Sequence, residues 1–208
     1  MLFLVAVVVA LGFWLRPAQA VSAPPILFQV PGFTLVDQAG VPFGIADLHG
    51  APWVANFFFT SCPTVCPGHM ASLATLQERL AAAGSPAAIV SVSVDPATDT
   101  PERLEAYGGR LGADSARWHL LTGDEATIRS LVEGGFLSAM GSPRPVADTG
   151  HNGHTPPLST GKPIYEISHA NRFFVVDGAG RVRALVAPEG DPVSAILAVL
   201  ASLAVEAP

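Results

Sequence analysis

Two cysteines, Cys62 and Cys66, are the residues of this sequence best suited to chemistry. They are its only cysteines and lie four positions apart, in FFFTSCPTVCPGHM. They therefore form one local unit and not a disulfide framework for the whole fold. The context predicts a buried strand that ends before the cysteines, which occupy the turn into a helix. On a first helical turn both side chains would share one face, and the helix N-terminus would stabilise a thiolate.

Two neighbouring thiolates repel each other, and either a disulfide bond or a soft metal cation relieves that repulsion. Three residues separate the cysteines, whereas thioredoxin-type oxidoreductases have two, but this spacing still permits a disulfide. A structural zinc site needs four protein ligands, so a chain with two cysteines excludes a site of four cysteines or of three cysteines and a histidine. Thiolate and imidazole in low coordination suit Cu(I). Thiol redox chemistry and an inert structural disulfide are the alternatives, although a bridge across so short a loop stabilises little.

A third ligand must come from elsewhere in the chain, and His169 is the candidate. It lies in the segment ISHA, directly before the apolar run RFFVVD. A residue that enters a central strand can lie opposite the cysteine turn. Asp95 follows another apolar run. It either has a functional role, beside the metal ligands or in contact with a partner, or it only caps the turn before Pro96. Both interpretations of Asp95 remain open.

Three other histidines have weaker claims to a functional role. His151 and His154 form the element HNGH within a segment rich in Gly and Pro, which is too flexible to preorganise a metal site. We expect them in a solvated loop. His69 is predicted to be a surface residue of the helix that follows the cysteines.

The elements that must position these residues alternate along the chain. Apolar runs predict strands at 53–59, 88–94, 118–121, 172–177 and 181–186, and a hairpin at 33–43. Apolar periodicity predicts helices after the cysteines and after Thr100, Asp124 and Asp191. The order indicates the α/β class, with a mainly parallel central sheet and helices on both faces. Residues 141–162 are expected to form a long insertion before a C-terminal hairpin at one edge of the sheet.

The N-terminus predicts export. Leu2 to Leu15 is uncharged and almost entirely apolar, and Ala18-Gln19-Ala20 has the form of a cleavage site. Residues 1–20 are therefore a cleaved signal peptide or an uncleaved membrane anchor, and both place the domain in the periplasm or on the outer face of the membrane. Residues 21–31, with three prolines, are expected to be a linker, and residues 32–208 one domain. A net charge of −6 without any Lys/Arg-rich run argues against a nucleic-acid partner.

Three segments resemble the Sco/SenC family of copper proteins, which have a thioredoxin-like fold. They are TSCPTVCP at 60–67, SVDPATDTPE at 93–102 and ISHANRFFVVDGAG at 167–180, and they occur in the family's order. The similarity spans residues 33–186. The resemblance implies that Cys62, Cys66 and His169 bind copper, as Cu(I), Cu(II) or both. It also implies a role in building the CuA centre of cytochrome c oxidase, with the oxidase's copper-bearing subunit or another copper acceptor as partner.

The sequence departs from the family at the residue before the histidine. Members often have Asp there, and this chain has Ser168. A carboxylate beside a ligating imidazole orients the ring and raises its basicity, whereas Ser168 could accept a hydrogen bond but supplies no charge. Ser168 and Asp95 are thus the candidates for a supporting role around the ligands.

Two functions remain open from the sequence. One is a metallochaperone, which needs a thiol reductase partner because oxidation of the cysteines abolishes metal binding. The other is a thiol–disulfide oxidoreductase that reduces cysteines of an acceptor protein and for which His169 is dispensable. A third interpretation is a peroxiredoxin-like peroxidase, since those proteins also have a Thr shortly before a Cys in a turn after a strand.

Overall fold

Six strands form the central sheet of the structure, a computed structural model that describes residues 23–145 and 165–205. In order across the sheet they are β1 (Phe28–Gln29), β10 (Arg181–Val186), β9 (Phe173–Val176), β4 (Trp53–Phe58), β5 (Ala88–Ser93) and β6 (Trp118–Leu121). β4, β5 and β6 run parallel, while β9 is antiparallel to β4 and β10 is antiparallel to β9. The predicted α/β class is confirmed, and the sheet is parallel in one half and antiparallel in the other.

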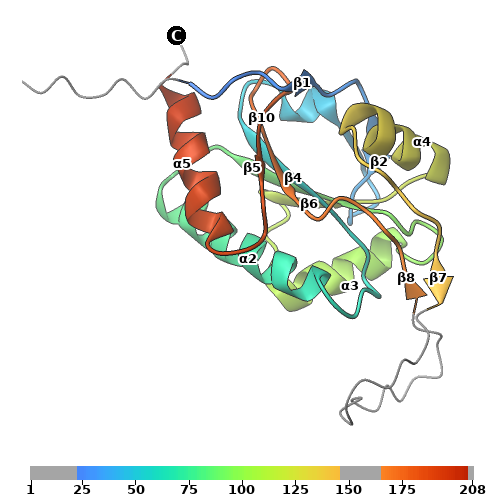
Figure 1. Cartoon of the computed structure of the whole chain (residues 1–208). Coiled ribbons are helices and arrows are strands. Elements are labelled where there is room, and N and C mark those ends of the chain that lie inside the picture. The colour runs from blue at the N-terminus through green and yellow to red at the C-terminus, as the bar shows by residue number, and fades with distance from the viewer. Residues whose placement is uncertain (1–22, 146–164, 206–208) are drawn as a thin grey trace, which may run out of the picture.

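Helices cover both faces of this sheet, as predicted (Figure 1). Parallel neighbours require right-handed crossovers, so the two crossovers that progress from β4 to β5 to β6 place their helices on the same face. That face carries α2 (Cys66–Ala82), α3 (Pro101–Leu111) and α5 (Pro192–Ala204). The opposite face carries α4 (Glu125–Ser130) and the π-helical turn η2 (Leu131–Gly135). A short 3-10 helix, η1 (Ile45–Leu48), precedes β4.

Strand β4 is buried along its whole length, because helices lie above and below it. On one face the Phe57 ring meets the Phe136 ring edge-on, with centroids 5.2 Å apart. On the other face Asn56 contacts the Met70 sulfur of α2, with 3.7 Å between Nδ2 and Sδ. Such a strand reads as a continuous apolar run, and it ends at the cysteine loop.

The segment expected to be a linker contributes an edge strand. The Leu27 N–H donates to the Val182 carbonyl over 2.8 Å, and the Val30 N–H donates to the Gly180 carbonyl over 2.9 Å. A two-residue strand such as β1 carries no detectable period, so the sequence pattern did not predict it. The C-terminal hairpin was expected at the edge of the sheet. This is wrong, because β1 lies outside β10.

Two small sheets flank the central one. β2 (Thr34–Val36) and β3 (Pro42–Gly44) pair antiparallel, which confirms the predicted hairpin. β7 (Arg144–Pro145) pairs with β8 (Tyr165–Glu166), and most of the predicted insertion, with His151 and His154, lies outside the described residues. The predicted signal or anchor at 1–20 also lies outside them. Within residues 23–145 and 165–205, no helix is long and apolar enough to span a membrane.

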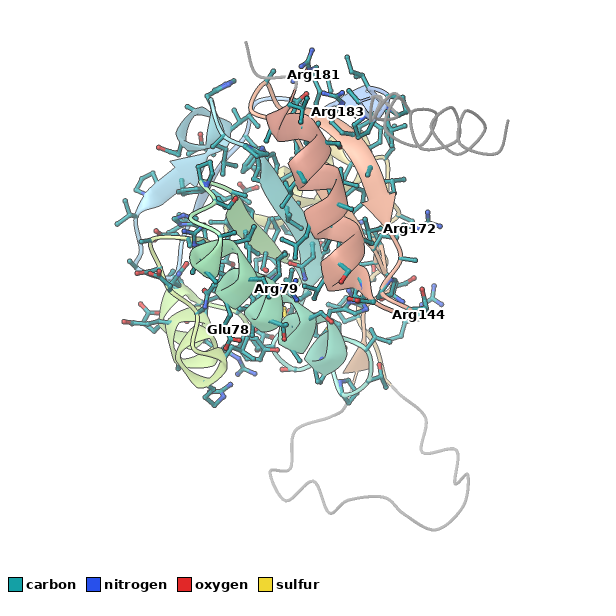
Figure 2. All side chains as sticks on the ribbon, turned by 90° about the vertical axis from the view of Figure 1, so that its left-hand side faces the viewer. Glu78, Arg79, Arg144, Arg172, Arg181 and Arg183 are labelled. Carbon is teal, nitrogen blue, oxygen red and sulfur yellow. The ribbon has the colours of Figure 1, made fainter. Side chains whose placement is uncertain are left out.

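A buried ion pair fixes the turn between β9 and β10. Asp177 Oδ2 accepts hydrogen bonds from Arg183 Nη1 and Arg181 Nε, over 2.9 and 2.8 Å. Burial opposes ionisation of Asp177, but hydrogen bonds from these residues outweigh it and lower the pKa of the carboxyl group. Figure 2 shows Arg181 and Arg183 close together, at the opposite end of the molecule from Arg144. The turn fixes the register of β9, and thus of the residues that precede it.

Candidate metal centre

The cysteines lie at the C-terminal end of β4, but only one of them belongs to the helix. Cys66 is the first residue of α2 and is 1% exposed. Cys62 is half-buried and precedes the helix. The prediction that both lie on the first helical turn is therefore wrong. Cys62 is followed by Pro63, and a proline disfavours the helical conformation of the residue before it.

The two cysteines shift each other's pKa in opposite directions. The hydrogen bond from the Cys66 side chain is the main reason why the pKa of Cys62 falls to about 5, and hydrogen bonds from the Cys66 and Thr64 backbones add to it. The same bond, together with burial, raises the pKa of Cys66. The reduced pair at neutral pH is thus one thiolate, on Cys62, and one thiol, on Cys66. A thiolate is both a nucleophile and a soft metal ligand.

His169 offers an unused ring nitrogen. Its Nδ1 lies 2.7 Å from the Ile167 carbonyl oxygen, which is a hydrogen bond that Nδ1 donates. The tautomer that donates from Nδ1 leaves a lone pair on Nε2. Nε2 is buried and has no hydrogen-bond partner in the described part of the chain. An imidazole whose one nitrogen is fixed by a carbonyl and whose other nitrogen is vacant has the arrangement of a metal ligand.

The pairing of β9 with β4 brings His169 towards the cysteine loop. Ala55 pairs with Phe174 in this antiparallel ladder, so continuing the register places residues 169–170 beside residues 59–60. The Phe59 and His169 rings meet edge-on, with centroids 5.9 Å apart. The Phe59 carbonyl accepts from the Cys62 N–H over 3.2 Å, and its backbone also hydrogen-bonds to the Cys66 side chain. Phe59 thus contacts all three predicted ligands at one end of the sheet.

The three predicted ligands are neighbours without being closed around a common point. Among the residues that the structure describes, no three His, Cys, Asp or Glu side chains are gathered tightly enough to hold a metal ion. Cys62 and Cys66 share one loop, and His169 approaches that loop through its ring contact with Phe59. Binding one ion with all three would require the side chains to close on it.

The structure gives backbone contacts for both predicted supporting residues. Asp95 is buried, and its carbonyl accepts from the Thr98 and Asp99 N–H groups over 3.0 and 2.8 Å, as in a turn cap. Ser168 is exposed, and its carbonyl accepts from the Gly141 N–H over 2.7 Å. The group that orients the His169 ring is the Ile167 carbonyl, which no side-chain pattern in the sequence reveals.

His69 is closer to the site than the sequence indicated. It was expected on the helix surface, but it is 8% exposed and its ring meets Phe173 edge-on at 5.4 Å. Burial lowers the pKa of His69, and the neighbouring His169 lowers it further, while Cys62 acts in the opposite direction. The spacing of Cys66 and His69, i and i+3 on one helical face, was the signal for this proximity.

A cavity of about 490 Å³ lies beside His169 and gives access to it. Its wall includes the exposed Leu137 and Leu185 and the cation Arg172. Figure 2 shows Arg172 on the same edge of the molecule as Arg144. Leu137 is 67% exposed and has a positive φ of 50°, a strained conformation of the kind that concentrates at functional sites.

Comparisons with known proteins point to one family. The SCO1/SenC family model matches residues 27–204. The SCO1 protein homolog of Bacillus subtilis is 35% identical over 99 residues, which are 48% of this chain and 51% of that protein, so the chain spans about half the length of this relative. A SCO1/SenC family lipoprotein from Bacillus anthracis is 30% identical, with a TM-score of 0.72 over 89% of this chain and 99% of that one. Bradyrhizobium japonicum ScoI with copper bound shares the fold, with a TM-score of 0.66, 22% identity and coverage of 84% and 99%.

Proposed function

The chain belongs to the SCO1/SenC family, and from this premise we propose that it carries copper through Cys62, Cys66 and His169 and delivers it to a respiratory oxidase. The observation that carries the proposal is the buried Nε2 of His169, which has no hydrogen-bond partner among the described residues, on a ring that meets Phe59 at the cysteine loop. Two sulfurs and one imidazole are a soft donor set, which suits Cu(I). The copper-bound ScoI of Bradyrhizobium japonicum, which has the same fold, supports copper as the cargo.

Copper binding by this site is coupled to protons. The Cys62 thiolate is ready to bind, whereas Cys66 must release its proton to water, because its raised pKa keeps it a thiol. His169 would bind through the lone pair of Nε2, while Nδ1 keeps its proton and donates it to the Ile167 carbonyl. Protons compete for the same atoms, so affinity falls as the pH falls. An acceptor takes the ion by replacing these ligands one at a time.

The same cysteines make the carrier sensitive to oxidation. A disulfide between Cys62 and Cys66 removes both thiolates and with them the copper site. We therefore include a thiol reductase among the partners, together with a copper-bearing oxidase subunit. We place the protein outside the cytoplasm, exported by its N-terminal segment. The lipoprotein nature of the Bacillus anthracis relative supports that location.

The second candidate is a thiol–disulfide oxidoreductase that acts on the acceptor's cysteines. The half-buried Cys62 and its pKa of about 5 favour it, because a stable, accessible thiolate attacks disulfides. In this function His169 carries no chemistry.

Copper titration of the fully reduced protein separates the two candidates. We expect one copper per chain in competition with a Cu(I) chelator, and weaker binding by Cys62→Ser and His169→Ala. His119→Gln is the matched control, because His119 lies on β6 and its Nδ1 is also buried without a partner in the described chain. Wild-type affinity in Cys62→Ser or His169→Ala would contradict copper carriage. Wild-type turnover of a disulfide substrate by copper-free His169→Ala would favour the oxidoreductase.

A further inference from the structure

The two residues before Cys62 are held by side chains from another part of the chain. The Thr60 N–H donates to Asp99 Oδ2 over 2.9 Å, and the Thr60 hydroxyl donates to Asp99 Oδ1 over 2.5 Å. Arg103 donates from Nε to Thr60 Oγ1 over 2.7 Å and from Nη2 to Ser61 Oγ over 2.9 Å. Asp99 lies in the turn after β5, and Arg103 lies in the first turns of α3. The start of the cysteine loop is thus tied to a neighbouring crossover.

The carboxylate at the centre of this network is fully buried. Asp99 is 0% exposed, and it also accepts from the Ser93 hydroxyl over 2.6 Å and lies 3.4 Å from Arg103 Nε. Burying a charge is costly unless it is paired and hydrogen-bonded. An apolar side chain in the same place would cost less, so the buried charge is best explained by the single geometry that it imposes on its partners.

The loop that follows has little packing of its own. Pro63, Thr64 and Val65 are exposed, and the Cys62 N–H donates back to the Phe59 carbonyl over 3.2 Å. Cys66, by contrast, is fixed by α2 and is buried. The position of the Cys62 sulfur relative to the Cys66 sulfur therefore depends on where the chain leaves Thr60 and Ser61.

We propose that Asp99 and Arg103 are positioning residues for the dithiol: they fix Thr60 and Ser61, and thereby fix where the Cys62 sulfur lies relative to the Cys66 side chain. Ligands that are fixed in advance lose less conformational entropy when they bind one ion or form one bond. The part of this inference that concerns metal affinity rests on the proposed function. The part that concerns the dithiol itself applies to the metal-free protein.

The test compares Asp99→Asn and Arg103→Ala with Arg110→Ala. Arg110 is the matched control, since it is an exposed arginine of the same helix and donates to the Ala106 carbonyl of that helix. The first readout is Cu(I) affinity, measured by chelator competition. The second is the equilibrium of the metal-free dithiol with glutathione, in which the two thiols give two electrons and two protons to glutathione disulfide. One Cys62–Cys66 bond and two glutathione molecules are formed.

Both readouts are taken well below the unfolding temperature, so that a loss of stability alone does not alter them. We expect the Cu(I) association constant and the disulfide-forming equilibrium constant each to fall about tenfold in Asp99→Asn and Arg103→Ala. Arg110→Ala should stay within about twofold of wild type. If Arg103→Ala is folded and both its Cu(I) association constant and its disulfide-forming equilibrium constant equal those of wild type, the inference is wrong.

Two further outcomes keep the test of the positioning role conclusive. If Asp99→Asn does not fold, Arg103→Ala and Ser61→Ala, which removes the Nη2 contact, carry the test. If wild-type protein binds no copper but Arg103→Ala still lowers the glutathione equilibrium constant, the proposed copper function fails and the positioning role stands.

Discussion

Replacing Cys66 with alanine should move the titration of Cys62 towards higher pH. The hydrogen bond from the Cys66 side chain is the largest cause of the pKa of about 5 at Cys62, compared with an ordinary 9.0. Alanine removes that donor. Hydrogen bonds from Thr64 and from the backbone at position 66 remain, so the pKa of Cys62 should rise most, but not all, of the way to the ordinary value.

The size of the effect decides which pH to use. A thiol with a pKa of about 5 is about 99% thiolate at pH 7, and one with a pKa of about 9 is about 1% thiolate. The more basic thiolate is also intrinsically more reactive, by about 60-fold for a Brønsted coefficient of about 0.45. The two effects nearly cancel at pH 7. At pH 5.5 the thiolate fraction differs about 2,400-fold, so the variant should react up to about 40-fold more slowly.

The assay is the initial rate of reaction with an aromatic disulfide probe between pH 4 and 9, with thiolate absorbance as a second measure. Cys66→Ser is the control, because its hydroxyl still donates and should leave the midpoint between those of wild type and Cys66→Ala. A wild-type midpoint near 9 would refute the thiolate and thiol assignment. So would a Cys66→Ala midpoint that stays near 5.

Three further variants test the fold around the site. Burial against Phe43, whose ring stacks at 4.0 Å, lowers the pKa of His119. As the pH falls below about 6.5, His119 is protonated in the unfolded chain before it is protonated in the folded protein, so wild type loses stability. His119→Phe should lose less stability than wild type between about pH 6.5 and 5, as measured by urea unfolding. Gly178→Ala places a Cβ 2.8 Å from the Gly50 carbonyl carbon and should lower the unfolding free energy by about 1–3 kcal/mol. Leu73→Ala, at a fully buried position of α2, should cost about 2–5 kcal/mol and leave the Cys62 midpoint unchanged.

The order of strands and helices was predictable because local patterns determine it. β6 and β10 have the predicted bounds, and β4 and β5 each end one residue earlier than predicted. Thr100, Asp124 and Asp191 cap their helices as expected, each accepting a hydrogen bond from the N–H three residues on. Apolar runs, Pro at the first helical position and capping side chains all act within a few residues.

The features that the sequence did not reveal depend on backbone conformation and on contacts between distant segments. Cys62 lies outside the helix because of Pro63, which a count of spacing alone overlooks. The Ile167 carbonyl that orients His169 is a backbone atom and leaves no mark on composition. Asp99 was part of a recognisable motif, but its burial and its bonds to Thr60 arise only when two crossovers pack together.

X-ray absorption at the copper edge of the loaded, reduced protein tests the central claim most directly, because it identifies the atoms bound to the ion. The account predicts two sulfur ligands and one imidazole nitrogen in wild type, and loss of the imidazole signal in His169→Ala. An unchanged imidazole signal in His169→Ala, or a copper site with fewer than two sulfurs in wild type, would contradict it.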